Sequence, residues 1–293
     1  MTEISPTALV SDTATVAHER RKRPVALRLQ VHRCHQWLGD LADSAPGRTL
    51  LGAIGLLAFI VIWKLAQESG LGRNGTIPDP FAIPDALLAE WQAGRLASAV
   101  TSSLAHYGWG LFMGTLLGFA LGAATALSST LDRLLGLVVR VLRPIPPLAW
   151  VIFAIAWFKI SHEGAAFVIS IGVFWVNYFT THAAVRGVDP KYYELARAFG
   201  QSSLAKRFID VTLPSAAPGI FAGIHTGIGS ALMALIAAEL IGMPGIGQEM
   251  NVAAGVGDYV TVAVYMLVIS LLYAVFDTVF VQLEKLGTQW RPS

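Results

Sequence analysis

Long apolar stretches separated by polar segments dominate the sequence from about residue 49 onward. A bilayer core about 30 Å thick needs roughly 20 mostly apolar residues for each helical span. The pattern therefore predicts an all-α membrane protein with six transmembrane helices and both termini on one side. The expected spans are Thr49–Leu65, Ser103–Leu127, Pro144–Phe158, Ala165–Val185, Gly219–Ile241 and Tyr259–Val281.

The composition agrees with a membrane protein. Of the 293 residues, 54% are hydrophobic and 14% are charged, whereas a soluble domain carries about 25% charged residues. The net charge of +2 is too small to indicate a nucleic-acid partner. The single cysteine, Cys34, excludes a disulfide within this sequence.

Residues 1–48 are predicted to be a cytoplasmic tail followed by an interfacial segment. The first apolar stretch begins near Leu50, so we expect a retained span and not a cleaved signal peptide. His32, Cys34 and His35 lie close together, but an Arg-rich amphipathic stretch favours an interfacial helix over a metal site. We expect this chain to hold no metal and no cofactor.

Lysine and arginine are distributed unevenly among the loops. Seven precede the first span, three lie in 133–143, five lie between the fourth and fifth spans, and two follow the sixth. Cytoplasmic loops carry the excess of positive residues. We therefore expect both termini and the loop Arg186–Pro218 to be cytoplasmic.

Two amphipathic segments flank the predicted spans. Leu131–Arg143 places arginines among leucines and valines, which predicts an interfacial helix before a short, proline-broken third span. On the opposite side, a short helix is expected from about Pro84 to Trp91, ended by Gly94, and it would cap the bundle.

Glycines recur every four residues in two spans, which places them on one helix face. This face would serve either static packing or helices that slide during a conformational cycle. The glycines are Gly110, Gly114, Gly118 and Gly122 in the second span and Gly219, Gly223 and Gly227 in the fifth.

The loop Arg186–Pro218 is predicted to form two short helices. Asp189 and Pro190 start the first and Gly200 stops it, with an apolar face of Tyr192, Leu195, Ala196 and Phe199. The second, Ser203–Thr212, would be capped by Ser202 or Ser203 and closed by Pro214, with an apolar face of Leu204, Phe208 and Val211. Apolar faces outside a membrane indicate a protein partner.

These residues carry a resemblance. Glu194, Ala196 and Gly200, followed by Leu213 and Pro214, resemble the EAA loop of bacterial ABC importer permeases. The similarity covers about Phe81 to Trp290 and includes RPIPPLAW (143–150), AAVRGVD (183–189), LPSAAPGIFAGI (213–224), AAELIG (237–242) and GIG (245–247). The chain is most similar to the branch serving nitrate, sulfonates, taurine and bicarbonate. It departs from the EAA pattern at Leu195, where alanine is usual.

The resemblance implies a MetI-like type I importer permease fold, with a permease domain at 49–293, its core at about 95–285 and its coupling loop at 186–218. It implies a homodimer in the bacterial inner membrane, partnered by two ATPase subunits that bind ATP and Mg and by a periplasmic binding protein. The chain itself would catalyse nothing. Docking on the ATPase would fall to Tyr192, Tyr193, Glu194, Leu195, Ala196, Phe199 and Gly200, braced by Leu204, Phe208, Leu213 and Pro214.

Polar residues within the spans are candidates for the pathway or for packing between helices. The pathway candidates are Trp175, Asn177, Tyr178, Thr181, His225 and Ser230. Carboxylates within spans are costly and therefore candidates for function. Glu239 would serve as an outer gate, as a cap for the loop glycines or in substrate contact, and Asp277 is expected to pair with an arginine.

Two other classes of protein compete with this interpretation. An intramembrane enzyme would need a catalytic motif at membrane depth, and the sequence contains neither HExxH nor GxSxG. A self-sufficient secondary transporter commonly shows internal repeats and broken spans, and it would leave the apolar cytoplasmic loop unexplained.

Overall fold

A computed structural model describes residues 45–70, 75–201 and 203–287, and all regular structure in these ranges is helical. Residues 1–44 of the N-terminal segment expected at 1–48 lie outside the described residues, and so do His32, Cys34, His35 and the candidate cap Ser202. The chain divides into two units between residues 71 and 72.

The first unit contributes helix α2, Ala45–Glu68. The expected first span lies inside this helix, and residues 49–68 are long and apolar enough to cross a membrane. Lys64 Nζ donates a hydrogen bond of 2.9 Å to Gln67 and lies 3.7 Å from Glu68. The apolar stretch of α2 therefore ends in a small polar cluster.

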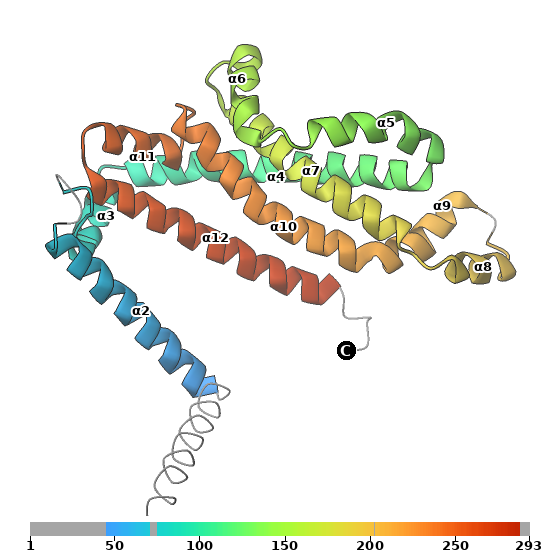
Figure 1. Ribbon diagram of the computed structural model, residues 1–293, viewed down its shortest axis with the longest axis horizontal. Coiled ribbons are helices and arrows are strands. Elements are labelled where there is room, and N and C mark those ends of the chain that lie inside the picture. Colours follow the sequence, from blue (N-terminus) through green and yellow to red (C-terminus); the bar gives the residue numbers. More distant parts are fainter. Residues whose placement is uncertain (1–44, 71–74, 202, 288–293) are drawn as a thin grey trace, which may run out of the picture. The chain divides into compact units, whose positions relative to one another are not determined.

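The second unit is a helical bundle (Figure 1). Its elements are η2 (Pro80–Ala82), α3 (Ile83–Gln92), α4 (Arg95–Leu127), α5 (Ser129–Leu142), α6 (Pro147–Phe158), α7 (His162–Arg186), α8 (Pro190–Ala198), α9 (Leu204–Arg207), η3 (Phe208–Thr212), α10 (Leu213–Leu240), α11 (Ile246–Gly255) and α12 (Tyr259–Gly287). In the described part of the chain, five helices are long and apolar enough to span a membrane, or six if bent α5 and α6 form one span.

Helix α7 lies between α4 and α10, and glycines line both contacts. A Cβ built at Gly114 would lie 2.5 Å from the Ser170 carbonyl oxygen, and one at Gly122 would lie 2.6 Å from that of Tyr178. On the other side of α7, a Cβ at Gly219 would lie 2.6 Å from the Ala184 Cβ. The remaining glycines of the two rows meet α7 in the same way, at Gly110, Gly118, Gly223 and Gly227.

The helix expected at 131–143 is α5, Ser129–Leu142. α5 runs beside α4 and α7, and α6 turns away from it by 97° after the proline-rich link (Figure 1). Asp132 at the start of α5 pairs with His182 and Arg186 of α7, each at 3.2 Å. These contacts hold the start of α5 beside the end of α7, and the bent pair of α5 and α6 is compatible with either a broken span or a re-entrant loop.

The expected second loop helix is not a separate element. α9, η3 and α10 form one continuous helical segment, 204–240. Pro214 therefore does not close a helix and instead lies in the first turn of α10. The widened π-turn at η3, in which the Leu213 N–H donates to the Phe208 carbonyl, carries the helix up to this proline.

The short helix expected near Pro84 is α3, which lies at the same end of the bundle as α11. Buried Glu90 accepts hydrogen bonds from Arg95, which starts α4, and from the Tyr265 hydroxyl of α12 at 2.8 Å. The Arg95 guanidinium holds the pKa of the Glu90 carboxyl below its usual value, outweighing burial, which acts in the opposite direction. This polar contact joins α3 to α4 and α12.

A matched pair of substitutions in α4 tests the close approach of α4 and α7. Gly114→Ala places a methyl group against the α7 backbone and should destabilise the fold by about 1–3 kcal/mol. Gly108→Ala lies in the same helix with nothing within 4 Å of the new Cβ, and it should stabilise the helix by up to ~1 kcal/mol. Thermal unfolding in detergent measures both variants, and equal effects would contradict the packing described.

The Glu90 contact predicts that the stability of the fold depends on pH in the acidic range. Because the pKa of Glu90 is lowered in the folded state, the Glu90 contact contributes fully to stability above the usual carboxyl pKa of about 4.3. This contribution is lost as the pH falls through the pKa of the folded state. The difference in thermal stability between the native chain and Glu90→Gln should therefore shrink below about pH 4. Asp85→Asn, an exposed site in the first turn of α3, is the control. A difference that stays constant with pH would refute the assignment.

Candidate ATPase-docking loop and pathway

Helix α8 forms as the sequence predicts. The Asp189 carboxylate caps it by accepting from the Lys191 N–H at 2.9 Å, and Pro190 occupies the first turn. Gly200 has φ +80°, the left-handed conformation that favours glycine, and it ends the helix. The expected cap at Ser203 makes no side-chain hydrogen bond, although Ser203 does precede α9.

The expected apolar face of α8 divides between solvent and the bundle. Tyr192, Leu195 and Phe199 are exposed, and Ala196 is buried. Tyr193 also turns inward, packing beside the buried cluster of α7 and α10 and placing its hydroxyl 3.1 Å from Thr212 Oγ1. Two members of the expected docking set, Ala196 and Tyr193, therefore attach α8 to its own chain.

A hollow of about 310 Å³ lies between α8 and the start of α10. Its lining includes Tyr192, Leu195, Phe199 and Pro214. Glu194 is exposed on α8, and Leu204 is exposed at the start of α9. The arrangement presents an apolar surface where the chain connects α7 to α10.

Three pathway candidates are enclosed within the bundle. Asn177 donates to the Val173 carbonyl at 3.1 Å, and the Tyr178 hydroxyl accepts from Thr125 at 3.2 Å. Thr181 is fully buried beside Gly122. All three residues are packed on α7 against α4, where the missing glycine side chains leave no open space, so they do not line a cavity here.

The other pathway candidates are partly exposed. His225 of α10 lies 2.7 Å from Asp277 of α12, so the expected pairing of Asp277 with an arginine is wrong. Ser230 donates to the Gly172 carbonyl at 3.2 Å. The indole nitrogen of Trp175 is buried and has no hydrogen-bond partner among the described residues.

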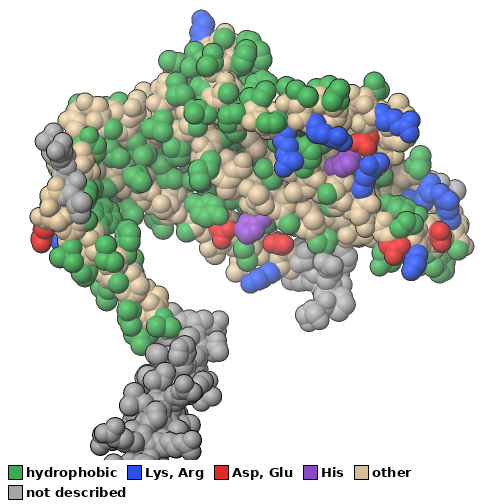
Figure 2. Space-filling model, viewed as in Figure 1, with side chains coloured by type: hydrophobic (Ala, Val, Ile, Leu, Met, Phe, Trp, Pro, Cys, Tyr) green, Lys and Arg blue, Asp and Glu red, His purple; other side chains and the backbone are tan. Residues whose placement is uncertain are grey.

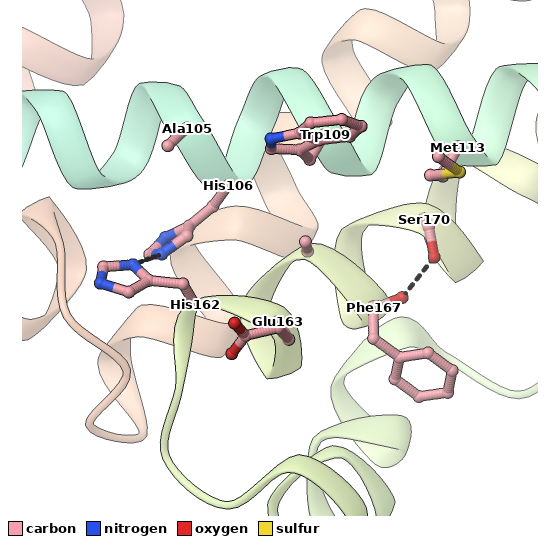
Figure 3. Close-up of a pocket in the computed structure, with 9 residues that line it drawn as sticks. Ala105, His106, Trp109, Met113, His162, Glu163, Phe167 and Ser170 are labelled. Carbon is pink, nitrogen blue, oxygen red and sulfur yellow. Dashed lines mark hydrogen bonds between the residues drawn. The ribbon is translucent and has the colours of Figure 1, made fainter.

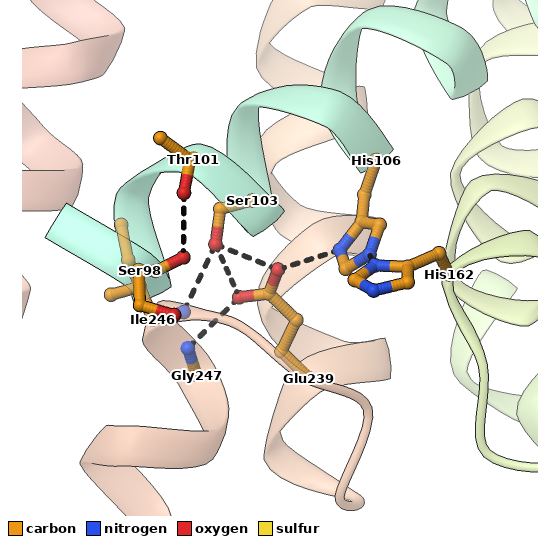
Figure 4. A network of polar contacts seen from close by, with 8 residues as sticks. All are labelled: Ser98, Thr101, Ser103, His106, His162, Glu239, Ile246 and Gly247. Carbon is orange, nitrogen blue, oxygen red and sulfur yellow. Dashed lines mark hydrogen bonds and ion pairs between the residues drawn. The ribbon is translucent and has the colours of Figure 1, made fainter. Parts of the chain in front are cut away.

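Glu239 is fully buried near the end of α10. Its carboxylate accepts from the Ser103 hydroxyl at 2.7 and 2.9 Å and from the Gly247 N–H at 2.9 Å (Figure 4). His106 Nδ1 lies 3.1 Å away, and its other ring nitrogen faces His162. The carboxylate thus holds the glycine turn before α11, one of the roles considered for it.

Sequence reasoning missed Ser103, His106 and His162. Ser103 and His106 share a face of α4 with Gly110, because the intervals of three and four residues match a helical repeat. That spacing was visible in the sequence. The approach of His162, 56 residues away in sequence, was not.

The comparisons with known proteins agree with this fold. Residues 114–286, well over half of the chain, match the family model described as binding-protein-dependent transport system inner membrane component. The bicarbonate transport system permease protein CmpB of Synechococcus elongatus is 30% identical, covering 76% of this chain and 84% of that protein. The putative aliphatic sulfonates transport permease protein SsuC of Escherichia coli is 29% identical, with coverages of 81% and 90%.

The nitrate import permease protein NrtB of Leptolyngbya laminosa is 30% identical, with coverages of 72% of this chain and 77% of that protein. Among solved structures, an inward-facing form of the MetNI methionine ABC transporter aligns with a TM-score of 0.56 at 18% identity, covering 68% of this chain and 97% of that chain. The fold is therefore that of the MetI-like permeases. The relatives are named as transport permeases and not as enzymes.

The family model, relatives at 30% identity over most of their length and the shared fold lead to one conclusion: this chain belongs to the binding-protein-dependent transport system inner membrane components, the multi-pass membrane permeases of ABC transporters.

Proposed function

We propose that this chain forms half of the translocation pathway of an ATP-driven importer for a small oxyanion, such as nitrate, a sulfonate or bicarbonate. A second copy completes the pathway, two ATPase subunits dock on the cytoplasmic side, and a periplasmic binding protein delivers the substrate. The family supports the partnership with a binding protein, and the names of the relatives support the class of substrate.

One observation carries the docking assignment: Tyr192, Leu195 and Phe199 form an exposed apolar face on a helix outside the spanning segments. A face of this kind is stabilised by burial against a protein partner. α8 is attached to η3 through Tyr193 and Thr212, and η3 continues into α10. Movement of a docked ATPase is therefore transmitted to α7 and α10, the helices that flank the loop.

The distribution of basic residues supports cytoplasmic termini and a cytoplasmic α8. The arginines at α5 also support an anionic substrate. Arg140 is exposed on α5, the first half of the bent α5–α6 pair. Arg143 is exposed directly after α5, and its guanidinium lies 4.3 Å from the Phe179 ring centre. Arginine within a span faces protein or water and not lipid, so we assign this α5 face to the wall of the pathway.

Substitutions of two nearly equally exposed side chains distinguish docking through α8 from docking through α9. Phe199 is 80% exposed and Leu204 is 79% exposed. Phe199→Ala should weaken co-purification of the ATPase about tenfold or more, as truncation of an anchoring side chain does. Leu204→Ala should leave it nearly unchanged. Equal retention of the ATPase by both variants and by Glu194→Lys would overturn the docking assignment.

The assignment of α5 to the pathway predicts that charge matters for transport. Arg140→Gln should reduce uptake of the anion by proteoliposomes several-fold while the ATPase remains bound, because an attractive charge is lost from the wall. Lys285→Gln, which removes an exposed positive charge near the end of α12, is the control. Unchanged uptake by Arg140→Gln would exclude this role. Binding of nitrate, taurine, alkanesulfonates and bicarbonate to the periplasmic protein would identify the substrate.

A further inference from the structure

Three titratable side chains from three helices form a connected row at the end of the bundle that carries α11. His162 of α7 is exposed, and its Nδ1 lies 2.5 Å from Nε2 of His106 in α4. The opposite ring nitrogen of His106 lies 3.1 Å from the Glu239 carboxylate of α10. His106 is 1% exposed and Glu239 is 0% exposed (Figure 4). This row of side chains therefore leads from the surface at His162 to the buried carboxylate of Glu239.

The hydrogen bonds determine the state of the carboxylate. The backbone N–H of Gly247 can only donate. Ser103 accepts from the Ile246 N–H at 2.9 Å, so its own hydroxyl hydrogen points at Glu239. Since these neighbours donate, they favour ionised Glu239, and an ionised carboxylate only accepts. Nδ1 of His106 must then carry a hydrogen.

This assignment limits how many protons the two histidines hold. With both rings neutral, Nδ1–H of His162 donates to Nε2 of His106, and the buried carboxylate is left with an unbalanced negative charge. One added proton keeps a hydrogen bond between the rings and makes the cluster neutral. A second added proton would set two N–H groups against each other. The pair therefore takes up one proton, and this proton offsets the costly burial of Glu239.

A cavity of about 490 Å³ gives access to this cluster. His162 and Glu163 lie at its wall beside Trp109 and Ser170 (Figure 3). Glu163 is exposed, and its carboxylate interacts electrostatically with both histidines. Solvent protons can thus reach His162 directly.

Among the described residues, the other elements around Glu239, His106 and His162 contribute few charged groups. α11 contributes the backbone N–H groups of Ile246 and Gly247, and Lys159, in the link before α7, is exposed. Imidazole is the side chain whose charge ordinarily changes between about pH 5 and 8. The two imidazole groups of this cluster are those of His106 and His162.

We propose that Glu239, His106 and His162 form a proton-binding site, filled from the cavity, whose single proton holds α4, α7, α10 and the turn before α11 together. The ligand is a proton supplied by solvent. When it leaves, the buried carboxylate is unbalanced and this end of the bundle loosens. The site does not depend on which substrate the permease transports.

Thermal unfolding of the purified full-length chain, measured from pH 5.5 to 8.5, tests the proposal. The native chain should lose roughly 2–4 °C in Tm as the pH rises through this range. The double substitution of His106→Gln and His162→Gln removes both rings while leaving side chains that can hydrogen-bond to each other and to Glu239, and it should flatten this step. Glu239→Gln should reverse it, because a protonated pair beside a neutral amide is itself an unbalanced buried charge.

His182→Gln is the matched control, since His182 lies in the same helix and pairs with Asp132 at the opposite end. It should preserve the step of the native chain. If the double variant keeps the native profile, or if His182→Gln abolishes the step, the proposal fails. If Glu239→Gln does not fold, the comparison of the double variant with His182→Gln still decides between the outcomes. A purely structural role for Glu239 would lower Tm equally at every pH and would not reverse the slope.

Discussion

The close approach of α7 to α4 and α10 is the contact on which the other features of the bundle depend. Without side chains at Gly114 and Gly219, the helices pack with their backbones almost in contact. In a membrane, association of helices depends on this close packing, because lipid removes the hydrophobic driving force. α7 is consequently enclosed on two sides, and its polar residues there serve packing.

The same approach brings distant polar groups together at both ends of α7. At one end, Asp132 of α5 reaches His182 and Arg186. At the other, His162 reaches His106, which contacts Glu239. Asp132 and Glu239 thereby each meet a histidine or an arginine, as expected where the cost of an unpaired charge is high. The helix contacts and the charge pairs reinforce each other.

The loop between α7 and α10 follows a different physical rule. α8 is short and mostly exposed, and Tyr193 and Ala196 attach it to the bundle while three large apolar side chains face outward. α9 and η3 merge into α10, so a load on the loop is applied directly to a long helix. The lever role proposed for this loop needs no catalytic group, and the relatives are named for transport.

The sequence by itself determined the helical membrane fold, the start and stop of α8 and the glycine rows, because these depend on local composition, on Asp189, Pro190 and Gly200, and on helical spacing. Only the tertiary structure decided that α5 runs along the bundle, that Pro214 continues a helix, that Asp277 pairs with His225 and that Glu239 meets two histidines. These features depend on contacts between residues far apart in sequence. Spacing along one helix fixes which residues share a face, but not which partner that face meets.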